Sequence, residues 1–90
     1  MGILPDKVPL TERLAGLAEE ATELAQAALK YRRALDKTNP TPVDEDTAYE
    51  RLLEELADVM VYTSTFPINM QYVTERAFEK TERWKSRLSE

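Results

Sequence analysis

A chain of 90 residues that is 42% hydrophobic and 32% charged has the size and composition of one small globular domain. It contains neither cysteine nor histidine, which excludes disulfides, thiolate metal sites, Ser-His triads and most zinc or iron sites. Its formal net charge of -5 argues against a nucleic-acid polymer as partner, because proteins that bind duplexes present a basic face to the phosphates.

The start of the chain carries Gly2, Pro5 and Pro9, which predict an irregular arm over residues 1–9. This arm lacks the basic n-region of a signal peptide. No apolar run in the chain approaches the ~20 residues of a membrane span. We therefore expect a cytoplasmic protein without a membrane partner.

A long helix is predicted from about Thr11, a candidate N-cap, to Leu35, although Leu10 could already belong to it. The stretch lacks proline and is rich in strong helix formers. Its apolar residues recur every three or four positions and make one stripe: Leu14, Leu17, Ala21, Leu24, Ala28 and Tyr31. Gly16 costs roughly 1 kcal/mol relative to alanine inside a helix and would permit close approach of another helix.

The segment 36–46 breaks the helical pattern. It contains Thr38-Asn39-Pro40-Thr41-Pro42, in which two prolines and an Asn-Pro step are typical of a loop. A proline-containing loop of this length is expected to connect two helices.

A second helix is expected from about Thr47 toward Ser64, with Asp44 or Asp46 as its cap and Pro67 ending or kinking it. Four apolar residues give it helical spacing and two more broaden the buried face: Leu52, Leu56, Val59 and Met60, with Leu53 and Val61.

A third helix should begin near Ile68–Tyr72 and run to about Leu88. One row of its residues recurs at helical spacing, with Phe78 beside it: Val73, Ala77, Thr81, Trp84 and Leu88. These elements predict an all-α fold in one domain over 1–90, an antiparallel helical hairpin with a third helix packed across it.

Two acidic clusters interrupt the apolar pattern of the first two helices. They are Glu19-Glu20-Ala21-Thr22-Glu23 and Glu54-Glu55-Leu56-Ala57-Asp58. If the two helices pair antiparallel, both clusters can point at one spot. Carboxylates that share a small volume repel one another, which raises their pKa values or pushes the helices apart unless a cation lies between them.

The spacing within each cluster places two carboxylates on one face, because residues three apart on a helix are neighbours. Two such pairs supply four oxygen ligands: Glu20, Glu23, Glu55 and Asp58. Glu19 and Glu54 lie roughly 100° to one side and are better placed to hold a bound water.

A site built from oxygen ligands alone favours Mg²⁺, with Mn²⁺ as a substitute, and Mg²⁺ in such sites usually serves phosphate chemistry. Calcium is disfavoured because the chain has no EF-hand loop. The alternative is that both clusters are solvated faces, as acidic runs on helices commonly are. The chain would then be a non-catalytic helical interaction module whose acidic face binds a basic partner.

Both clusters together match the motifs of a known family. Over residues 10–88 the chain resembles the MazG-like, all-α nucleoside triphosphate pyrophosphohydrolases. Their Glu-Glu-x-x-Glu motif corresponds to Glu19-Glu20-Ala21-Thr22-Glu23, and their Glu-x-x-Asp motif to Glu55-Leu56-Ala57-Asp58. The flanking Leu17-Ala18 and Leu52-Leu53 agree with the family context.

The resemblance implies a MazG-like helical bundle assembled as a homodimer or homotetramer. It implies Mg²⁺-dependent hydrolysis of a ribo- or deoxynucleoside triphosphate to the monophosphate and pyrophosphate, often to clear non-standard or surplus nucleotides. The residues that it implies as metal ligands are Glu20, Glu23, Glu55 and Asp58. Glu19 would help to position the metal or the attacking water, so Glu19 and Glu20 are the candidate catalytic residues.

The last helix departs from the family pattern. Many relatives carry a Lys and a downstream Asn there, which contact phosphate or base. Lys80 fits the Lys, but Arg83 and Trp84 stand where the Asn is expected. The chain therefore resembles a subgroup in which Lys80, Arg83 and Arg87 bind the substrate phosphates. The basic residues that end the first helix, Lys30, Arg32 and Arg33, either compensate the helix dipole or place one cation near a phosphate.

A sister branch, the phosphoribosyl-ATP pyrophosphohydrolases, shares both acidic blocks and offers an alternative activity. Its members usually carry a His soon after the Asp of the second motif. Here that stretch is Asp58-Val59-Met60-Val61-Tyr62-Thr63, without His. The missing His and the long proline-containing loop disfavour this branch.

Overall fold

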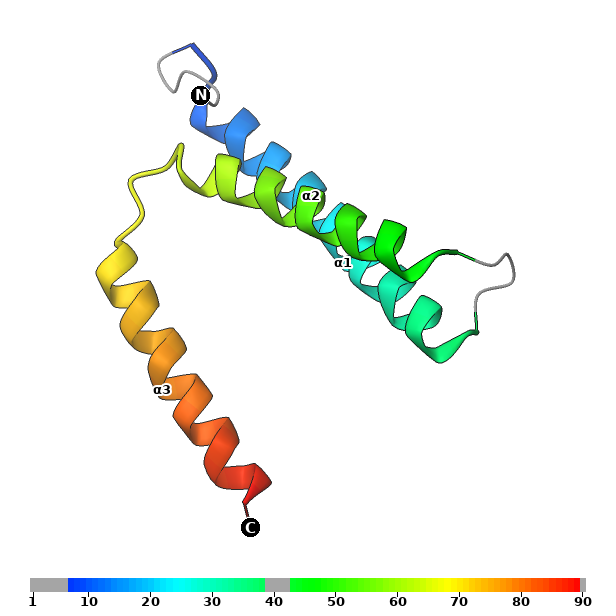
Figure 1. Cartoon of the computed structure of the whole chain (residues 1–90). Coiled ribbons are helices and arrows are strands. Elements are labelled where there is room, and N and C mark those ends of the chain that lie inside the picture. Colours follow the sequence, from blue (N-terminus) through cyan, green and yellow to red (C-terminus); the bar gives the residue numbers. More distant parts are fainter. Residues whose placement is uncertain (1–6, 39–42, 90) are drawn as a thin grey trace.

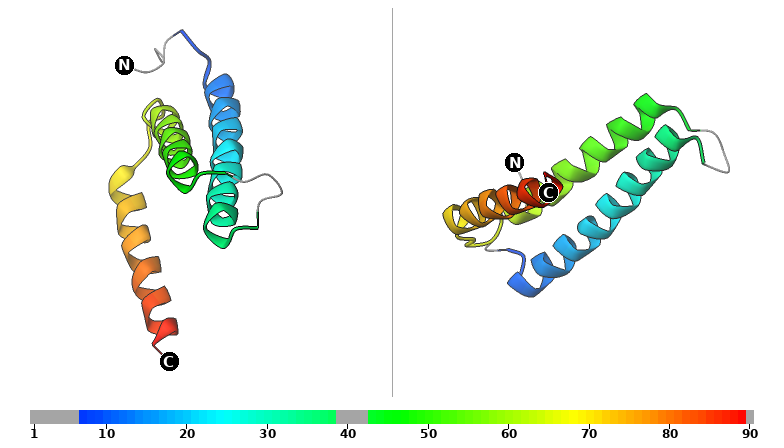
Figure 2. Two further views of the ribbon diagram at one scale, coloured as in Figure 1. Left: turned by 45° about the vertical axis from the view of Figure 1, so that its right-hand side comes forward. Right: turned by 90° about the horizontal axis from the view of Figure 1, so that it is seen from below.

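The computed structural model describes residues 7–38 and 43–89, and these residues form helices and connections without a strand. The helices are α1 (Leu10–Asp36), α2 (Glu45–Thr63) and α3 (Met70–Leu88). α1 and α2 lie side by side and antiparallel, whereas α3 leaves the end of α2 and extends away from both (Figure 1, Figure 2). The predicted all-α fold and helical hairpin are confirmed.

Two predicted irregular segments lie partly outside the described residues. These are residues 1–6 of the arm and residues 39–42 of the proline-containing loop. Within the described ranges, no helix combines the length and the hydrophobicity that a membrane crossing requires.

α1 begins at Leu10, which confirms the alternative that this residue belongs to the helix, but the predicted cap Thr11 is wrong. Pro9 occupies the N-cap position with φ -55° and ψ 148°, and its carbonyl oxygen accepts a hydrogen bond from the Arg13 backbone N–H at 3.1 Å. Thr11 therefore lies inside the first turn and does not cap the helix. Proline suits this place because its missing N–H is not needed at a helix start.

The other helix starts follow ordinary capping chemistry. The Asp44 carboxylate accepts a hydrogen bond from the Thr47 backbone N–H at 3.1 Å, which selects Asp44 over Asp46 as the cap of α2. Asn69 caps α3 in the same way. Pro67 lies in the connection after α2, so the prediction that the second helix stops before it is confirmed.

The contact between α1 and α2 uses one row of side chains from each helix. In α1, one row of half-buried or buried residues recurs every three or four positions: Leu17, Glu20, Leu24, Ala27, Tyr31 and Ala34. The corresponding row of α2 contains Ala48, Leu52, Glu55, Val59 and Tyr62. Each row has the heptad-like spacing of a helix–helix seam, and each includes one glutamate.

This row corrects the apolar stripe predicted for the first helix. Leu14, Ala21 and Ala28 are exposed, and Glu20 and Ala27 occupy inward positions instead. A spacing of three or four fits either set of residues, and the rotation of the helix about its axis selects between them.

The face predicted for the second helix is corrected as well. Four of its apolar residues remain exposed in the single chain: Leu53, Leu56, Met60 and Val61. A single neighbouring helix covers only one stripe, so the rest of this face stays exposed in the single chain.

Gly16 allows the close approach that its sequence position suggested. A Cβ at this residue would overlap the Tyr62 ring of α2 and lie 2.8 Å from its hydroxyl oxygen. Tyr62 is half-buried against α1 at this point. The missing side chain of Gly16 therefore provides the space that the ring fills.

Gly16→Ala is expected to destabilise the protein by about 1–2 kcal/mol, although alanine alone favours a helix by about 1 kcal/mol, because the added methyl overpacks the ring. Urea denaturation measures the change. In a Tyr62→Ala background the same substitution should stabilise the chain. Equal effects in both backgrounds would contradict the ring contact.

The third helix does not pack across the hairpin, so that expectation is wrong for the single chain. Within the described residues, α3 makes no packing contact with α1 or α2, and none of its residues is buried. Its large apolar side chains are exposed: Met70, Tyr72, Val73, Phe78, Trp84 and Leu88. The connection between Thr63 and Met70 directs α3 away from the hairpin (Figure 1).

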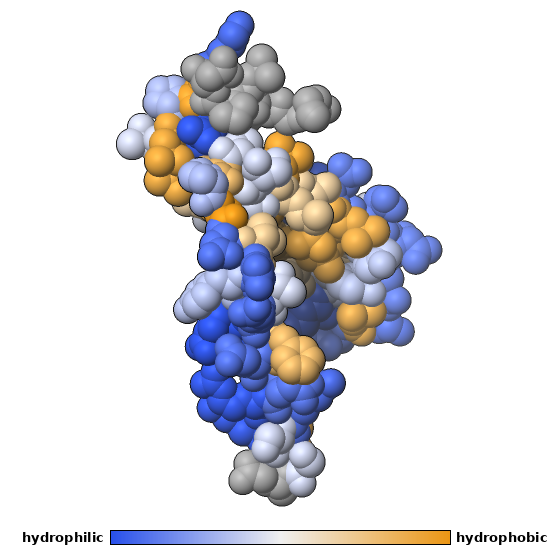
Figure 3. Space-filling model, turned by 90° about the vertical axis from the view of Figure 1, so that its left-hand side faces the viewer, coloured by the Kyte–Doolittle hydropathy of each residue, from blue (hydrophilic) through white to orange (hydrophobic). Residues whose placement is uncertain are grey.

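Hydrophobic surface is exposed in several places on the face of the molecule seen from the side of α3, and most of it lies in the upper half of the view (Figure 3). The buried hydrophobic residues within the described ranges are three alanines, Ala27, Ala34 and Ala48. A core this small stabilises a domain weakly, since a small chain buries a small share of its surface.

Candidate metal centre

Two carboxylates occupy positions in the α1–α2 seam that apolar side chains normally fill. Glu20 lies between Leu17 and Leu24 in the row of α1, and Glu55 lies in the corresponding row of α2. Both are half-buried. Moving a carboxylate out of water is unfavourable unless it is paired, hydrogen-bonded or bound to a metal.

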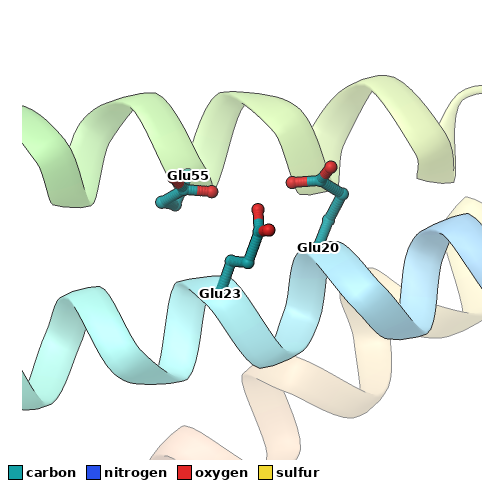
Figure 4. A group of neighbouring side chains, drawn as sticks. All are labelled: Glu20, Glu23 and Glu55. Carbon is teal, nitrogen blue, oxygen red and sulfur yellow. The ribbon is translucent and has the colours of Figure 1, made fainter.

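The antiparallel hairpin brings three carboxylates together. One oxygen from each of Glu20, Glu23 and Glu55 lies within 4.8 Å of the other two. Glu20 and Glu23 extend from α1 toward α2, and Glu55 extends from α2 into the same space (Figure 4). The sequence clusters of the two helices thus meet at one point, as expected from their spacing.

Two of the three carboxylates have a buried oxygen without a hydrogen-bond partner in the part of the chain that the structure describes. The Oε2 atoms of Glu20 and Glu55 are buried, and neither has a hydrogen-bond partner among the described residues. Buried polar atoms almost always have a partner, so such orphans call for an explanation. A hard cation bound by oxygen ligands supplies one, and the donor set fits Mg²⁺.

Burial is the largest cause that raises the pKa of Glu20 to about 6. The negative charge of Glu23 and a hydrogen bond with it raise this pKa further, and the charges of Asp58 and Glu55 add to the effect. The pKa of Glu55 is raised too, first by burial and then by Glu23 and Asp58, while Arg51 lowers it. The site therefore disfavours its own ionised state when no cation balances it.

The other predicted acidic residues, Asp58, Glu19 and Glu54, lie outside the group of three. Asp58 is exposed and outside the group of three, but its charge raises the pKa of both Glu20 and Glu55. Glu19 and Glu54 are exposed and outside the group as well.

The predicted phosphate-binding residues lie on a different element. Lys80, Arg83 and Arg87 line one hollow of about 390 Å³ on α3, together with Arg76. Because α3 does not contact the hairpin, the single chain does not bring these residues to the carboxylates.

Two further cations lie near the carboxylates. Lys30 was one of three basic residues that the sequence suggested for a phosphate contact, and Arg51 was not predicted. Lys30 and Arg51 line a hollow of about 310 Å³ together with Glu23 and Glu55. Sequence spacing contained the signal, because Lys30 follows Glu23 by seven residues and Arg51 precedes Glu55 by four, and both steps stay on one helix face.

Comparison of the chain with protein-family models, with curated proteins and with solved structures found no match. A function for the chain is therefore inferred from the carboxylate site and from the two sequence motifs that form it.

The raised pKa values of the carboxylates predict how the stability of the metal-free protein changes with pH. A carboxylate whose pKa is raised by folding stabilises the protein below its unfolded pKa, and this contribution is lost as the pH rises through the folded pKa. For Glu20 that window runs from its ordinary value of 4.5 to about 6. Without divalent cations, the melting temperature should fall across this window more in the native protein than in Glu20→Gln.

Thermal melts at several pH values, with EDTA or with Mg²⁺, measure this effect. Mg²⁺ should reduce the fall, since a bound cation stabilises the ionised carboxylates. If the melting temperatures of the native protein and of Glu20→Gln fell equally with rising pH, the raised pKa of Glu20 would be contradicted.

Proposed function

We propose that the chain is a Mg²⁺-dependent nucleoside triphosphate pyrophosphohydrolase of the MazG-like type. The observation that supports this proposal is the carboxylate group in the seam, with orphaned oxygens on Glu20 and Glu55. Without a cation this arrangement weakens the small fold around it. Strained electrostatics of this kind are concentrated at functional sites.

The metal ligands in this proposal are Glu20, Glu23 and Glu55, with Asp58 as the fourth carboxylate at the edge. Mg²⁺, when bound, neutralises charge on the phosphates and activates a water. Glu19, which is exposed one residue before Glu20, helps to orient that water. Attack of the water on phosphorus breaks the α–β phosphoanhydride bond and yields the nucleoside monophosphate and pyrophosphate.

The proposal includes a homodimer or homotetramer in which a second copy covers the apolar row of α3. Val73, Trp84 and Leu88 lie within about 60° of one another around this helix and are all exposed. A stable interface requires roughly 1,200–2,000 Å² of total buried surface, and α3 leaves its whole length available.

Charge favours a second copy as the partner of α3. This helix carries five basic and three acidic side chains in a chain of net charge -5, so it complements the acidic remainder. Lys80 and Arg83 lie beside the apolar row, where the other copy's hairpin would meet them. In this arrangement the basic residues of α3 assist phosphate binding from across the interface.

Release of pyrophosphate tests the activity directly. The full chain is incubated with canonical, deoxy- and modified triphosphates, and with phosphoribosyl-ATP, in the presence of Mg²⁺, Mn²⁺ or EDTA. Turnover with the metals and none with EDTA is expected. In parallel, the melting temperature should rise with Mg²⁺ and rise further when a substrate is added.

An interaction module that binds a basic partner predicts a different pattern. A nucleotide, which is itself an anion, would hardly raise the melting temperature of such a module. The module would hydrolyse none of the compounds. Absence of turnover on the whole panel, together with no stabilisation by Mg²⁺, would reject the enzymatic proposal.

A further inference from the structure

We infer that Lys30 and Arg51 bind the phosphates of the substrate, and that the nucleoside lies beyond them in a second hollow toward the loop end of the hairpin. This inference rests on the proposed function and adds to it a direction in which the substrate lies.

The first hollow connects the carboxylates to these two cations. It has a volume of about 310 Å³ and is lined by Glu23 and Glu55 together with Lys30 and Arg51. Lys30 lies two turns after Glu23, about 10 Å along the axis of α1. Because α2 runs antiparallel to α1, Arg51, which precedes Glu55, lies on the same side of the carboxylates as Lys30.

Both cations are available for a ligand. Their side chains are exposed, and among the described residues neither forms a salt bridge. Arg51 is close enough to Glu55 for its charge to lower the pKa of that carboxyl. Arginine offers a planar fork of donors and lysine a compact charge, and proteins use both for phosphate recognition.

A second, larger hollow adjoins the first. It has a volume of about 590 Å³, which lies within the range of small-molecule sites. Lys30 and Arg51 line both hollows, so they form the boundary between them. Val43, Thr47 and Ala48 line the second hollow as well, and they offer it apolar surface and one hydroxyl group.

The charges of the two hollows indicate which part of the substrate each one holds. Three further carboxylates line the second hollow, Asp46, Glu50 and Glu54. They repel phosphate groups, and they accept hydrogen bonds from sugar hydroxyls or base amino groups. The phosphates therefore belong on the side of the metal ligands, where a cation balances the charge, and the nucleoside belongs on the other side of Lys30 and Arg51.

Two ligands are used to test the phosphate contacts and the nucleoside contacts independently. The first is inorganic tripolyphosphate with Mg²⁺, measured by titration calorimetry on the full chain. The second is the best triphosphate from the hydrolysis panel, measured as KM. Lys30→Gln and Arg51→Gln should each weaken the binding of tripolyphosphate and raise KM by about tenfold, the effect of losing one charged hydrogen bond.

A variant in the second hollow should act differently. Val43→Trp fills space there, so it should raise KM for the triphosphate but leave the binding of tripolyphosphate unchanged. Lys85→Gln is the matched control. Lys85 pairs with Glu82 outside the two hollows, so this variant should behave like the native chain.

The inference is overturned if Lys30→Gln and Arg51→Gln bind tripolyphosphate as the native chain does. It is also overturned if Val43→Trp weakens both ligands equally while it remains folded by circular dichroism. Either result leaves the proposed activity standing, provided that the native chain hydrolyses a triphosphate. Absence of turnover and of Mg²⁺-dependent tripolyphosphate binding in the native chain rejects the proposed function and the inference together.

Discussion

Replacement of Glu20 by Gln is expected to reduce the release of pyrophosphate at least about 100-fold, the loss that follows when a reacting group is displaced by an ångström. The same substitution should raise the melting temperature of the metal-free protein. It removes a half-buried charge that Glu23, Asp58 and Glu55 oppose. Stability and activity thus change in opposite directions, as expected for a site that evolution has kept at a cost in stability.

Pyrophosphate release and melting temperature, measured together, distinguish a metal site from an acidic patch. The native protein should be stabilised by Mg²⁺, and Glu20→Gln should lose most of this stabilisation because it removes one ligand. Glu12→Gln is the matched control, since Glu12 lies in the first turn of α1 and outside the carboxylate group. A Glu20→Gln protein with native turnover and a native response to Mg²⁺ would contradict the metal centre.

Trp84→Glu is expected to dissociate the assembly. Trp84 is 63% exposed in the single chain, and a second copy would cover it in the proposed oligomer. Tryptophans at interface centres often contribute 2 kcal/mol or more, which corresponds to a roughly 30-fold weaker dissociation constant. A buried glutamate adds a desolvation penalty to that loss. Light scattering coupled to size-exclusion chromatography measures the mass.

A second variant controls for the added charge. Ser86 lies on the opposite side of α3 from Trp84, because two residues correspond to about 200° around a helix. Ser86→Glu should therefore leave the mass unchanged. A native chain that is monomeric at micromolar concentration, or a Ser86→Glu variant that dissociates as readily as Trp84→Glu, would refute this interface.

Loss of the assembly should also reduce activity, since the basic residues of α3 reach the carboxylates only from another copy in this arrangement. Within one chain, α3 does not contact the hairpin. A monomeric Trp84→Glu variant with full activity would show that the hairpin alone performs the reaction. It would then leave Lys30 and Arg51 as the only phosphate-binding cations required.

Helix ends and the placing of side chains on one helix face could be predicted from the sequence, because both depend on neighbours along the chain. The stop of the second helix before Pro67 and a cap at Asp44 or Asp46 followed from the steric and hydrogen-bonding rules of single residues. The spacing of Glu20 to Glu23 placed both carboxylates on one face, and this followed from helix geometry alone. Gly16 predicted that a helix could approach closely, and in the structure the Tyr62 ring lies against it.

The rotation of each helix about its own axis could not be predicted from neighbouring residues. A spacing of three or four residues is satisfied by a stripe through Ala21 and Ala28, and equally by one through Glu20 and Ala27. Hydrophobicity favours the first stripe, yet the structure uses the second. Packing between two whole helices decides the rotation, and no single segment contains that information.

Three helices, their approximate ends and two acidic motifs with neighbouring members are predictable from the sequence. The arrangement of the helices in space places Glu20 and Glu55 in the seam and lets Lys30 and Arg51 line one hollow with Glu23 and Glu55. It also leaves the apolar row of α3 uncovered. Helix formation and capping depend on contacts within a few residues, whereas burial and the meeting of charges depend on how separate helices are oriented in space.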